Sequence, residues 1–403
     1  MVAKRGERMK LHVGVFFGGK ATEHEVSVIS AIQAIENIDK NKYEIIPIYI
    51  TKDETFYTGD ALLDIKNYKD LNSLLKNCYA CAFEKRKGEE KIDILKIPSK
   101  LLNKKLGYIE LAFPILHGNK GENGGIQGFL EMLSIPYVGS NVSASAVSMD
   151  KDISKIIALS AGVPVIDFVA IDKYAYYKKS EVILTDILQK LEFPMIIKPA
   201  GGGSSIGIEV AKNSERLKAA IEQAFNYDVK LIIENKVEKI REVNCSVLGD
   251  IEDAKASVIE EPSTTDEILS FKDKYMQDST KGMSSAKRQI PADIDEDMRQ
   301  EIEDYSKTIF RKYGCSGVVR IDYIIDTQKN KVYFNEINPI PGSLSFYLWE
   351  PSGVKYKDLL DELIRIAIKR HQRNNEFNYS FDNNLFASNG LNMKGKLKGG
   401  SNG

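Results

Sequence analysis

The sequence predicts an α/β fold that passes into a mixed α+β fold, and two patterns indicate this. Strand-like and helix-like segments alternate through residues 12–116, which is typical of a parallel sheet covered by helices. Past Glu234 the strand-like segments become longer and read REVNCSVLGD, DAKASVIEE and KVYFNEINP. Because 403 residues are enough for two or three domain cores, we expect the two patterns to belong to different domains.

The first strand is expected over residues 12–17, HVGVFF, and a helix is expected over residues 26–38. A glycine turn at Gly18 separates them, and Thr22 is expected to be the N-cap of the helix. Residues 23–25, EHE, therefore stand at a helix N-terminus beyond the carboxyl end of a strand. Ligands bind at such positions in open α/β sheets.

The same stretch contains a near match to a phosphate-binding P-loop, which consists of Gly14, four residues, Gly19 and Lys20. A P-loop needs Ser or Thr straight after the lysine to ligate Mg²⁺, and Ala21 stands there instead. The strand also runs through Gly14, so the turn begins only at Gly18. We therefore do not assign a P-loop.

The other elements follow in chain order. Charge runs over residues 84–105 predict a solvated hairpin or loop insert. From about Phe377 the chain is polar, rich in Gly, Asn and Lys and without periodicity, so we expect a mobile tail. The remaining expectations are strands over 43–51, 108–116, 163–171, 193–200 and 230–235, and helices over 144–162, between 171 and 193, and over 214–226.

The composition limits the classes of partner. Lys plus Arg total 56 and Asp plus Glu total 57, so no field of one sign is available for nucleic acid or an acidic membrane. We therefore expect small-molecule partners. Four cysteines are too few for a disulfide framework, no apolar run approaches a membrane span, and no secretion signal with a cleavage site is recognisable, so we expect a cytoplasmic protein.

A glycine-rich loop is the first signal of chemistry. Residues 198–207 read KPAGGGSSIG and lie between two strand-like runs. The backbone N–H groups and the hydroxyls of Ser204 and Ser205 can close over phosphates, while Lys198 supplies positive charge at the strand end. Taken alone, such a loop is as compatible with a flexible turn as with a nucleotide lid.

Two strand-like runs near the end of the chain carry oxygen ligands. Asp322 lies in VVRIDYII, and Glu336 and Asn338 lie in VYFNEINP; QKN between the runs predicts a hairpin. Cross-strand neighbours come within side-chain reach, so two carboxylates and an amide can share hard cations such as Mg²⁺. The alternative is that the three polar residues only decorate a solvated face.

A family resemblance follows from nine motifs: GGKATEHEVS, FPILHGNKGENGGIQG, IPYVGS, SMDK, IIKPAGGGSSIG, REVNCSVLG, DKY, GCSGVVRID and FNEINPIPG. They cover most of residues 11–348. In this order and spacing they resemble the D-alanine:D-alanine ligase family of the ATP-grasp superfamily, with its D-Ala:D-Ser and D-Ala:D-lactate relatives. The resemblance implies an ATP-dependent carboxylate–amine ligase that joins two D-alanines through an acyl phosphate for peptidoglycan synthesis, and it suggests a homodimer.

The resemblance also implies an architecture. It predicts an ATP-grasp fold preceded by an N-terminal Rossmann-like (preATP-grasp) parallel-sheet domain. The implied domains are a substrate-binding domain over 1–139, a central subdomain with the phosphate loop over 140–234, a C-terminal subdomain with the metal and oxyanion residues over 235–375, and a flexible tail over 376–403.

The implied site residues fall into four groups. The nucleotide group would hold ATP; the metal group would bind two Mg²⁺ ions, with Mn²⁺ as a possible substitute; the substrate group would bind the amino acids; and the catalytic group would stabilise the oxyanion and relay a proton. These residues are Lys151, Lys198, Ser204, Ser205, Glu234, Val237 and Glu242 for the nucleotide; Asp322, Glu336 and Asn338 for the metal; Glu23, His117, Lys274, Tyr347 and Leu348 for the substrates; and Glu23, Ser204, Tyr275, Arg320 and the backbone of Gly342 for catalysis.

Several of these residues also have an ordinary structural interpretation. Glu23 can be a helix N-terminal carboxylate, His117 a satisfied turn histidine, and Arg320 an ion-pair partner of Asp322. Residues 274 and 275 can belong to a polar surface loop.

The chain departs from the family pattern near the acceptor. Tyr347 stands where the family usually has a serine that helps hold the carboxylate of the second substrate, and Pro339 stands where threonine is usual. A large ring shrinks or reorients that subsite. Alternatives to D-Ala:D-Ala ligation are therefore a different acceptor (D-Ser, D-lactate or another amine) and a nucleotide-binding pseudoenzyme. A nicotinamide oxidoreductase is a third alternative, but the GxGxxG fingerprint is missing.

Overall fold

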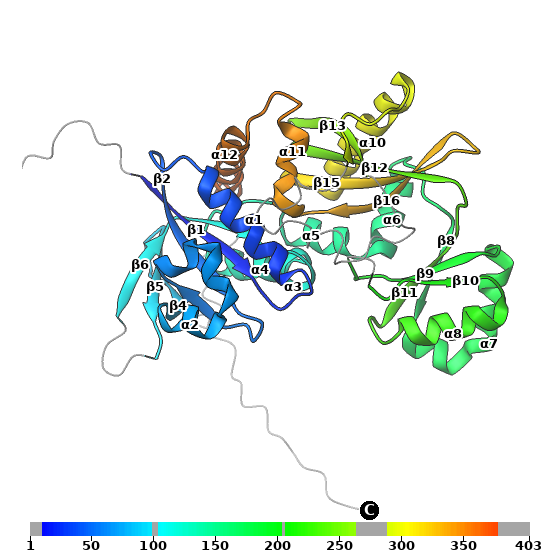
Figure 1. Ribbon diagram of the computed structural model, residues 1–403, viewed down its shortest axis with the longest axis horizontal. Coiled ribbons are helices and arrows are strands. Elements are labelled where there is room, and N and C mark those ends of the chain that lie inside the picture. Colours follow the sequence, from blue (N-terminus) through cyan, green and yellow to red (C-terminus); the bar gives the residue numbers. More distant parts are fainter. Residues whose placement is uncertain (1–9, 99–103, 204–205, 263–287, 378–403) are drawn as a thin grey trace, which may run out of the picture.

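The structure is a computed structural model that describes residues 10–98, 104–203, 206–262 and 288–377 (Figure 1). Its strands form three sheets of seven, four and five strands. Ser204, Ser205, Lys274 and Tyr275 lie outside the described residues, as does the expected tail beyond residue 377.

The seven-stranded sheet has the order β6-β5-β4-β3-β2-β1-β7. Only β2, β1 and β7 pair in parallel; the other neighbours are antiparallel. The prediction of a parallel sheet is therefore correct for β2, β1 and β7 and wrong for the other strands. The strands are β1 (Leu11–Gly18), β2 (Tyr43–Ile50), β3 (Phe56–Thr58), β4 (Tyr79–Lys85), β5 (Ile92–Lys96), β6 (Lys105–Ile109) and β7 (Leu111–Ile115).

The expected strand over residues 108–116 is two strands. β6 ends at Ile109 and β7 begins at Leu111, and the two lie at opposite edges of the sheet. The solvated hairpin or loop insert expected over 84–105 is only partly correct, because β4 and β5 do pair as antiparallel strands but β5 is buried inside the sheet. Short helical segments fill the connections: η1 (Asp60–Leu63), η2 (Ile65–Lys69), α2 (Leu71–Lys76), α3 (Asn119–Glu122) and α4 (Gly125–Met132).

Two helices from opposite ends of the chain cover one face of this sheet (Figure 1). They are α1 (His24–Asn37) and α12 (Tyr356–Asn375), and their apolar side chains form one cluster with Val13, Val15 and Phe17, which alternate along β1. The expected cap at Thr22 is wrong, because the N-cap is Glu23 and Thr22 Oγ1 donates to the Glu23 carboxylate at 2.5 Å. The return of α12 ties the end of the described chain to its first strand.

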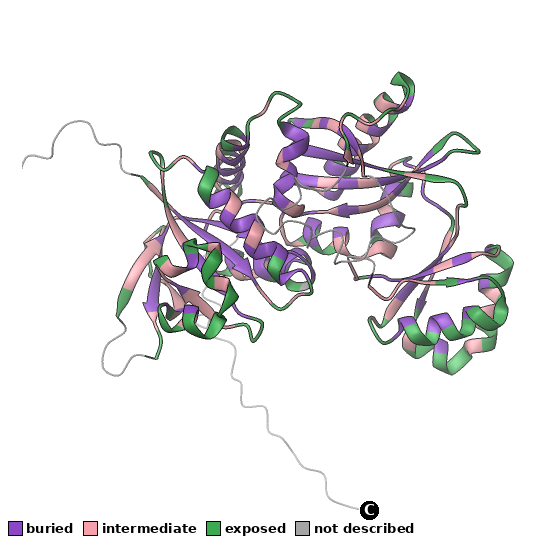
Figure 2. Cartoon of the chain, in the orientation of Figure 1, coloured by how far each residue is buried: buried purple, intermediate pink, exposed green. Residues whose placement is uncertain are grey.

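The four-stranded sheet is antiparallel, with the order β10-β9-β11-β8. Helices α7 (Lys173–Lys190) and α8 (Ser214–Ala224) cover one face, and apolar side chains fill the space between (Figures 1 and 2). The strands are β8 (Phe168–Asp172), β9 (Met195–Pro199), β10 (Glu209–Ala211) and β11 (Lys230–Asn235).

The helix expected over residues 144–162 is interrupted at Asp150. It forms α5 (Val142–Met149) and α6 (Lys151–Ser160). Asp150 is extended, and its carboxylate accepts from the N–H groups of the second and third residues of α6. Lys151 is consequently the first residue of a new helix.

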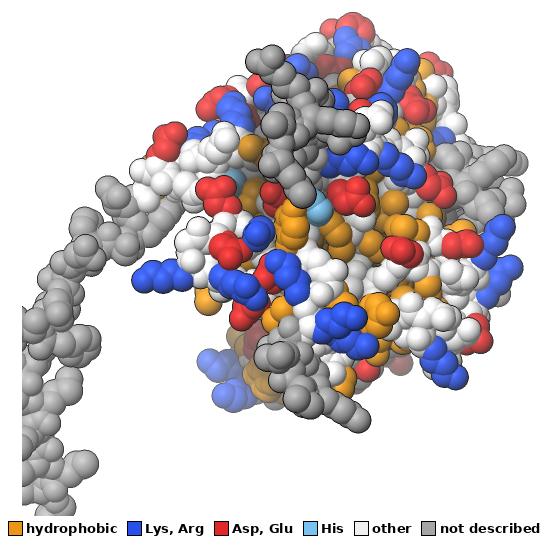
Figure 3. All heavy atoms as spheres, turned by 90° about the vertical axis from the view of Figure 1, so that its left-hand side faces the viewer, with side chains coloured by type: hydrophobic (Ala, Val, Ile, Leu, Met, Phe, Trp, Pro, Cys, Tyr) orange, Lys and Arg blue, Asp and Glu red, His pale blue; other side chains and the backbone are white. Residues whose placement is uncertain are grey.

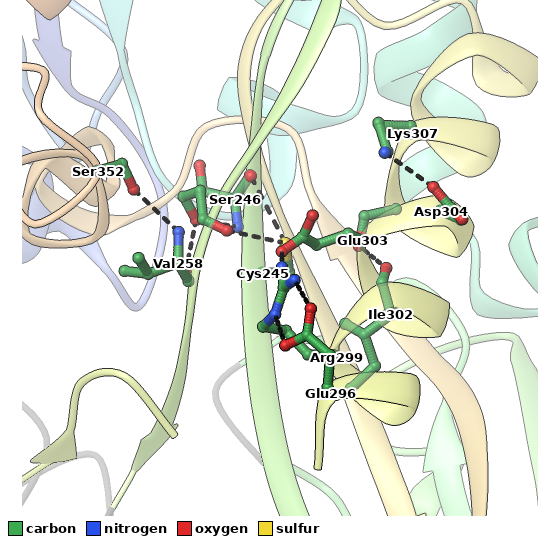
Figure 4. Close-up of polar contacts among 12 residues, drawn as sticks. Cys245, Ser246, Val258, Glu296, Arg299, Ile302, Glu303, Asp304, Lys307 and Ser352 are labelled. Carbon is green, nitrogen blue, oxygen red and sulfur yellow. Dashed lines mark hydrogen bonds and ion pairs between the residues drawn. The ribbon is translucent and has the colours of Figure 1, made fainter. Parts of the chain in front are cut away.

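The five-stranded sheet is also antiparallel, with the order β14-β13-β12-β15-β16. Helix α10 (Glu296–Tyr313) packs on it, and Figure 4 shows polar contacts at this junction. The other elements are β12 (Ile240–Gly249), β13 (Ala254–Pro262), β14 (Arg288–Gln289), β15 (Gly317–Asp326), β16 (Lys331–Asn338), η4 (Gly342–Ser345) and α11 (Phe346–Trp349).

The surface agrees with the balanced composition. Acidic and basic side chains are interspersed over the face seen in Figure 3. None of the helices in the described part of the chain is both long and apolar enough to cross a membrane.

Candidate active site

One cavity is lined by residues from three parts of the chain, which contain the seven-stranded, the four-stranded and the five-stranded sheet in that order. It brings together six of the polar residues that the resemblance singles out, although they lie far apart in the sequence; of the other described ones, Lys198, Glu234 and Asp322 are not part of its lining. Its polar and glycine lining includes Glu23, His117 and Glu122 from the first part, Lys151, Gly202 and Gly203 from the second, and Arg320, Glu336, Asn338 and Gly342 from the third.

Of the three residues expected to bind metal, Glu336 and Asn338 line this cavity, and Asp322 lies beside them on the neighbouring strand. Asp322 on β15 lies directly opposite Glu336 on β16, and Arg320 lies opposite Asn338. The side chains of Asp322 and Glu336 are 14% and 29% exposed, so they do not decorate a solvated face. Asn338 Nδ2 donates to Asp322 Oδ2 at 3.1 Å.

Arg320 pairs with Asp322 and also lines the cavity. Its Nε and one terminal nitrogen donate to the two oxygens of Asp322, each at 2.7 Å. Burial raises the pKa of Asp322 and outweighs the opposing effect of Arg320. Arg320 is thus the ion-pair partner that its ordinary interpretation requires, and it also lines the cavity.

Two carboxylates and an amide oxygen make a donor set that suits Mg²⁺ rather than a soft metal. Within the described ranges no cluster of three His, Cys, Asp or Glu side chains is arranged to hold a metal. The set Asp322, Glu336 and Asn338 is not such a cluster, because its third member is an asparagine. We conclude that its chemistry fits a hard cation that is also held by phosphate oxygens.

Lys151 contacts both Glu336 and the glycine-rich loop. Its Nζ lies 3.2 Å from Glu336 and donates to the carbonyl oxygen of Gly202 at 2.5 Å. Burial opposes the charged form of Glu336, but Lys151, Lys198 and Arg320 together hold its pKa below the usual value. A Cβ at Gly203 would lie 3.4 Å from a carboxylate oxygen of Glu23, so the loop rests against the first substrate residue.

A buried cluster of two lysines and one glutamate lies beside this region. Glu234 Oε1 is 2.6 Å from Lys155 Nζ, and Glu234 Oε2 is 2.6 Å from Lys198 Nζ. Burial opposes ionisation of Glu234, but the two lysines outweigh it and lower its pKa to about 2. Both Glu234 oxygens therefore face lysines, and its role beside adenine stays a prediction.

Lys155 was not predicted from the sequence. Its side chain is 1% exposed, and burial lowers its pKa, with partial compensation by Glu234. The available signal was a lysine four residues after Lys151, flanked by the apolar residues of α6. Such a lysine lies on the same helix face as Lys151 and is carried to the same region.

Replacing Glu234 by glutamine should destabilise the fold far more than replacing Lys155 by methionine. The glutamine variant leaves two buried ammonium groups unpaired, which costs about 3–5 kcal/mol. The Lys155→Met variant leaves one matched pair between Glu234 and Lys198, so we expect a loss below about 2 kcal/mol. Urea unfolding of both variants checks this, and equal losses would show that the two lysines do not share the carboxylate.

The two residues expected to bind the first amino acid, Glu23 and His117, are buried and hydrogen-bonded. His117 Nδ1 lies 2.8 Å from the carbonyl oxygen of Ile340, and its Nε2 lies 3.1 Å from Ser30 Oγ. Burial lowers the pKa of His117 to about 4, so the ring is neutral near pH 7. His117 is therefore a satisfied histidine that also lines the cavity beside Glu23.

Glu122 is a cavity residue that sequence reasoning missed. Its carboxylate accepts from the N–H of Gly118 at 2.5 Å and from the N–H of Ile340 at 3.2 Å. Burial raises its pKa to about 7 in spite of these hydrogen bonds. The signal was the glutamate at the end of HGNKGE, five residues after a histidine already singled out.

Tyr347 and Leu348, the two residues expected near the second substrate, do not line the cavity. Tyr347 is 7% exposed, and its phenol donates to Glu260 at 3.1 Å. The guanidinium of Arg288 lies 4.1 Å from the centre of its ring. Leu348 is fully buried. The phenol of Tyr347 therefore both enters the core and donates a hydrogen bond, although its partner is a protein carboxylate.

The remaining nucleotide residues flank the second and third sheets. Val237 follows β11 and is half-buried, and Glu242 lies on β12 opposite Ile324. Neither belongs to the cavity lining within the described part of the chain.

A lysine-lined antiparallel sheet with a glycine loop, facing a second sheet that carries paired carboxylates, defines the ATP-grasp class of enzymes. The family described as D-ala D-ala ligase N-terminus matches residues 12–140, and that described as D-ala D-ala ligase C-terminus matches residues 157–365. The chain belongs to the D-alanine–D-alanine ligase family, whose members are ATP-dependent carboxylate–amine ligases.

Similar proteins are found among curated sequences and solved structures. A D-alanine–D-alanine ligase of Thermosipho africanus is 38% identical over 379 residues, covering 93% of this chain and 98% of the relative. The D-alanine–D-alanine ligase structure from Coxiella burnetii is 29% identical, with a TM-score of 0.76 over 91% of this chain and 96% of that one. The VanG D-Ala:D-Ser ligase of Enterococcus faecalis is 31% identical, with a TM-score of 0.74 over 89% and 100%.

Proposed function

We propose that this enzyme joins two molecules of D-alanine with hydrolysis of ATP to ADP and phosphate, and so supplies D-alanyl-D-alanine for peptidoglycan synthesis. The observation that carries this proposal is one cavity whose lining joins Glu23, Arg320 and Gly342 to Lys151, which is expected to bind the nucleotide, and to Glu336 and Asn338, which are expected to bind metal. The curated relatives named D-alanine–D-alanine ligase, at 38% identity over nearly the whole chain, support it.

Nucleotide binding would use the lysines and the glycine-rich loop. Lys151 and Lys198 would contact the phosphates, the loop over 201–207 would close over them, and Glu242 would hold the ribose hydroxyls beside Val237. A D-alanine–D-alanine ligase of Bacillus anthracis, 26% identical with a TM-score of 0.63, has been solved in complex with ATP, which supports this assignment.

Metal binding would use Asp322, Glu336 and Asn338, which we propose to hold two Mg²⁺ ions or their Mn²⁺ substitutes. Bound there, the ions would neutralise charge on the transferring phosphoryl group and on its leaving oxygen. The protein contributes the hairpin that keeps the three ligands adjacent.

The first step would activate a carboxylate, which is otherwise a poor electrophile. Glu23 would bind the ammonium of the first D-alanine, with His117 nearby, so that the substrate carboxylate points toward the γ-phosphate. A carboxylate oxygen attacks phosphorus, the bond to the ADP oxygen breaks, and an acyl phosphate forms. Lys274 and Tyr275 would belong to a loop that excludes water, which would otherwise hydrolyse this intermediate.

The second step would form the peptide bond. The amine of the second D-alanine attacks the acyl carbon, and negative charge develops on the carbonyl oxygen. Arg320 and the backbone N–H of Gly342 would stabilise that oxyanion. Phosphate then leaves as the carbonyl re-forms, and Ser204, Tyr275 and Glu23 would relay the amine proton.

Product analysis tests the proposal directly. The purified protein is incubated with ATP, Mg²⁺ and D-alanine alone, and then with D-serine, D-lactate or other amines added. We expect the mass of D-alanyl-D-alanine from D-alanine alone, with one phosphate released per dipeptide. Product only with another acceptor would reject the assignment of the acceptor but keep the chemistry; absence of any nucleotide turnover would favour a pseudoenzyme. Light scattering tests the homodimer that we also propose.

The second candidate is ligation to a different acceptor, and the position of Tyr347 favours it. Its phenol is engaged by Glu260, so no compact hydroxyl is available where the family usually has one. We expect Tyr347→Ser to change KM for the acceptor by about tenfold and KM for ATP by less than about twofold. Initial rates with each substrate varied in turn check this. An unchanged acceptor profile would mean that Tyr347 does not influence the subsite, and Tyr347→Phe separates the loss of the phenol from the loss of the ring.

A further inference from the structure

The segment that contains Gly342 is held by side chains from the first part of the chain. Both polar groups of the Ile340 peptide unit are engaged: His117 Nδ1 donates to its carbonyl oxygen at 2.8 Å, and Glu122 accepts from its N–H at 3.2 Å. Ile340 is buried at 5% exposure. These contacts hold the segment two residues before Gly342.

Helix α1 holds the same segment one residue after Gly342. Ser30 Oγ accepts from the N–H of Ser343 at 3.0 Å, and Ser343 Oγ donates to Gln33 Oε1 at 2.8 Å. Ser30 and Gln33 are three residues apart in α1 and therefore lie on one helix face. This face is directed at the turn that begins with Gly342.

Ser30 connects the two holding points. Because His117 Nδ1 donates to a carbonyl oxygen, its Nε2 is the acceptor in the neutral ring, and the Ser30 hydroxyl donates to it over 3.1 Å. The same oxygen accepts from the N–H of Ser343. One fully buried hydroxyl thus links the histidine before Gly342 to the backbone after it.

The turn that follows has an unfavourable backbone. Ser343, Leu344 and Ser345 have φ values of 50°, 53° and 51°, the left-handed region that residues with a Cβ rarely occupy. Such a conformation persists only where its surroundings hold it. Loss of a holding hydrogen bond would let the turn relax and change the direction of the Gly342 N–H.

We infer that Ser30 is a positioning residue, which acts through Ser343 and His117 to aim the backbone N–H of Gly342 at the oxyanion. The inference rests on the proposed function, because it assumes that Gly342 stabilises that charge. It assigns a role in the second chemical step to a residue of α1 that is absent from the cavity lining.

Ser30→Ala tests this with a readout that a general loss of stability would not produce. We expect kcat to fall by about 10- to 100-fold, with KM for ATP within about twofold of wild type. A dipeptide analogue with a tetrahedral phosphinate in place of the peptide unit mimics the attacked carbonyl. Its affinity should fall by the same factor as kcat/KM, whereas ATP affinity measured by calorimetry should not change.

Ser27→Ala is the matched control. Ser27 is also a fully buried serine of α1, but its hydroxyl donates to the carbonyl of Ile115 at 2.5 Å and accepts from the N–H of Gly18 at 2.7 Å. Ser27→Ala therefore removes two side-chain hydrogen bonds, as Ser30→Ala does, but neither of them involves the segment that contains Gly342. Its phosphinate affinity should stay within about threefold of wild type, and a loss as large as that of Ser30→Ala would overturn the inference.

Gln33→Ala provides a second variant if Ser30→Ala does not fold. Gln33 is only half-buried and holds Ser343 through its side chain, so we expect a smaller fall, about 3- to 10-fold, in kcat and in phosphinate affinity. If the wild-type enzyme forms no dipeptide, the proposed function has failed. If wild type is active and both variants keep its kcat and analogue affinity, the positioning role is wrong.

Discussion

Asp322→Ala is expected to abolish Mg²⁺-dependent ADP formation, with kcat at least about a thousandfold below that of the wild-type enzyme. Asp322 lies opposite Glu336 in the hairpin and accepts from Asn338, so its removal deletes the central member of the candidate metal set. Coupled measurement of ADP release, with Mg²⁺ varied over a wide range, checks this. Glu336→Ala should have the same effect. No other described carboxylate lies directly opposite Asp322, so none can take the place of Glu336 as a metal ligand.

Asp326→Asn is the control for this prediction. Asp326 is a buried aspartate on the same strand, but its carboxylate caps the turn after β15 by accepting from the N–H groups of Gln328 and Lys329. Its turnover and Mg²⁺ half-saturation should match those of wild type. Near-normal turnover in Asp322→Ala, in protein whose thermal unfolding shows it to be folded, would reject the metal assignment.

Arg320→Lys is expected to lower kcat by about 100- to 1,000-fold at saturating Mg²⁺ and ATP. The planar guanidinium pairs with both oxygens of Asp322 while it lines the cavity beside Gly342. A lysine keeps the charge but is a compact donor that lacks the fork geometry. Loss of rate with little change in KM for ATP would indicate an interaction made mainly in the transition state. Steady-state phosphate release with each substrate varied provides the measurement.

Arg299→Lys is a control for loss of a forked arginine pair. Arg299 on α10 pairs with Glu296 through two of its nitrogens (Figure 4) and does not line the cavity. Its kinetics should equal those of wild type. The Mg²⁺ dependence separates the two site variants: Asp322→Ala should lose Mg²⁺-dependent turnover at every Mg²⁺ concentration, whereas Arg320→Lys should keep the wild-type Mg²⁺ half-saturation with a lower rate. Wild-type kcat in Arg320→Lys would remove Arg320 from the oxyanion site.

Much of the fold was predictable because local patterns specify it. Strand β1, helix α1 and the hairpin of β15 and β16 follow from apolar periodicity and from turn residues. The antiparallel strands β3–β6 were not predicted as such, because the order of strands in a sheet is set by long-range pairing rather than by the strand sequences. The break at Asp150 was missed because a helical pattern continues through it, and the cap becomes visible only in the backbone.

The candidate site shows the same division. Asp322, Glu336, Asn338 and the glycine-rich loop were found because each lies in a short segment with a chemical signature. Glu122 and Lys155 were not found, since their environment comes from residues far away in the chain, Ile340 and Glu234. A buried carboxyl or ammonium group looks like any surface residue in the sequence.

The sequence by itself determined the class of this protein, its family and the candidate residues for its chemistry, because donor types and glycine positions are local properties. Only the tertiary structure decided how those residues meet. It joins Glu23, Lys151 and Arg320 in one cavity, turns the phenol of Tyr347 toward Glu260, and lets Ser30 hold the segment of Gly342. The physical reason is that burial and hydrogen-bond partners depend on which distant segments pack together, and such packing is a property of the whole chain.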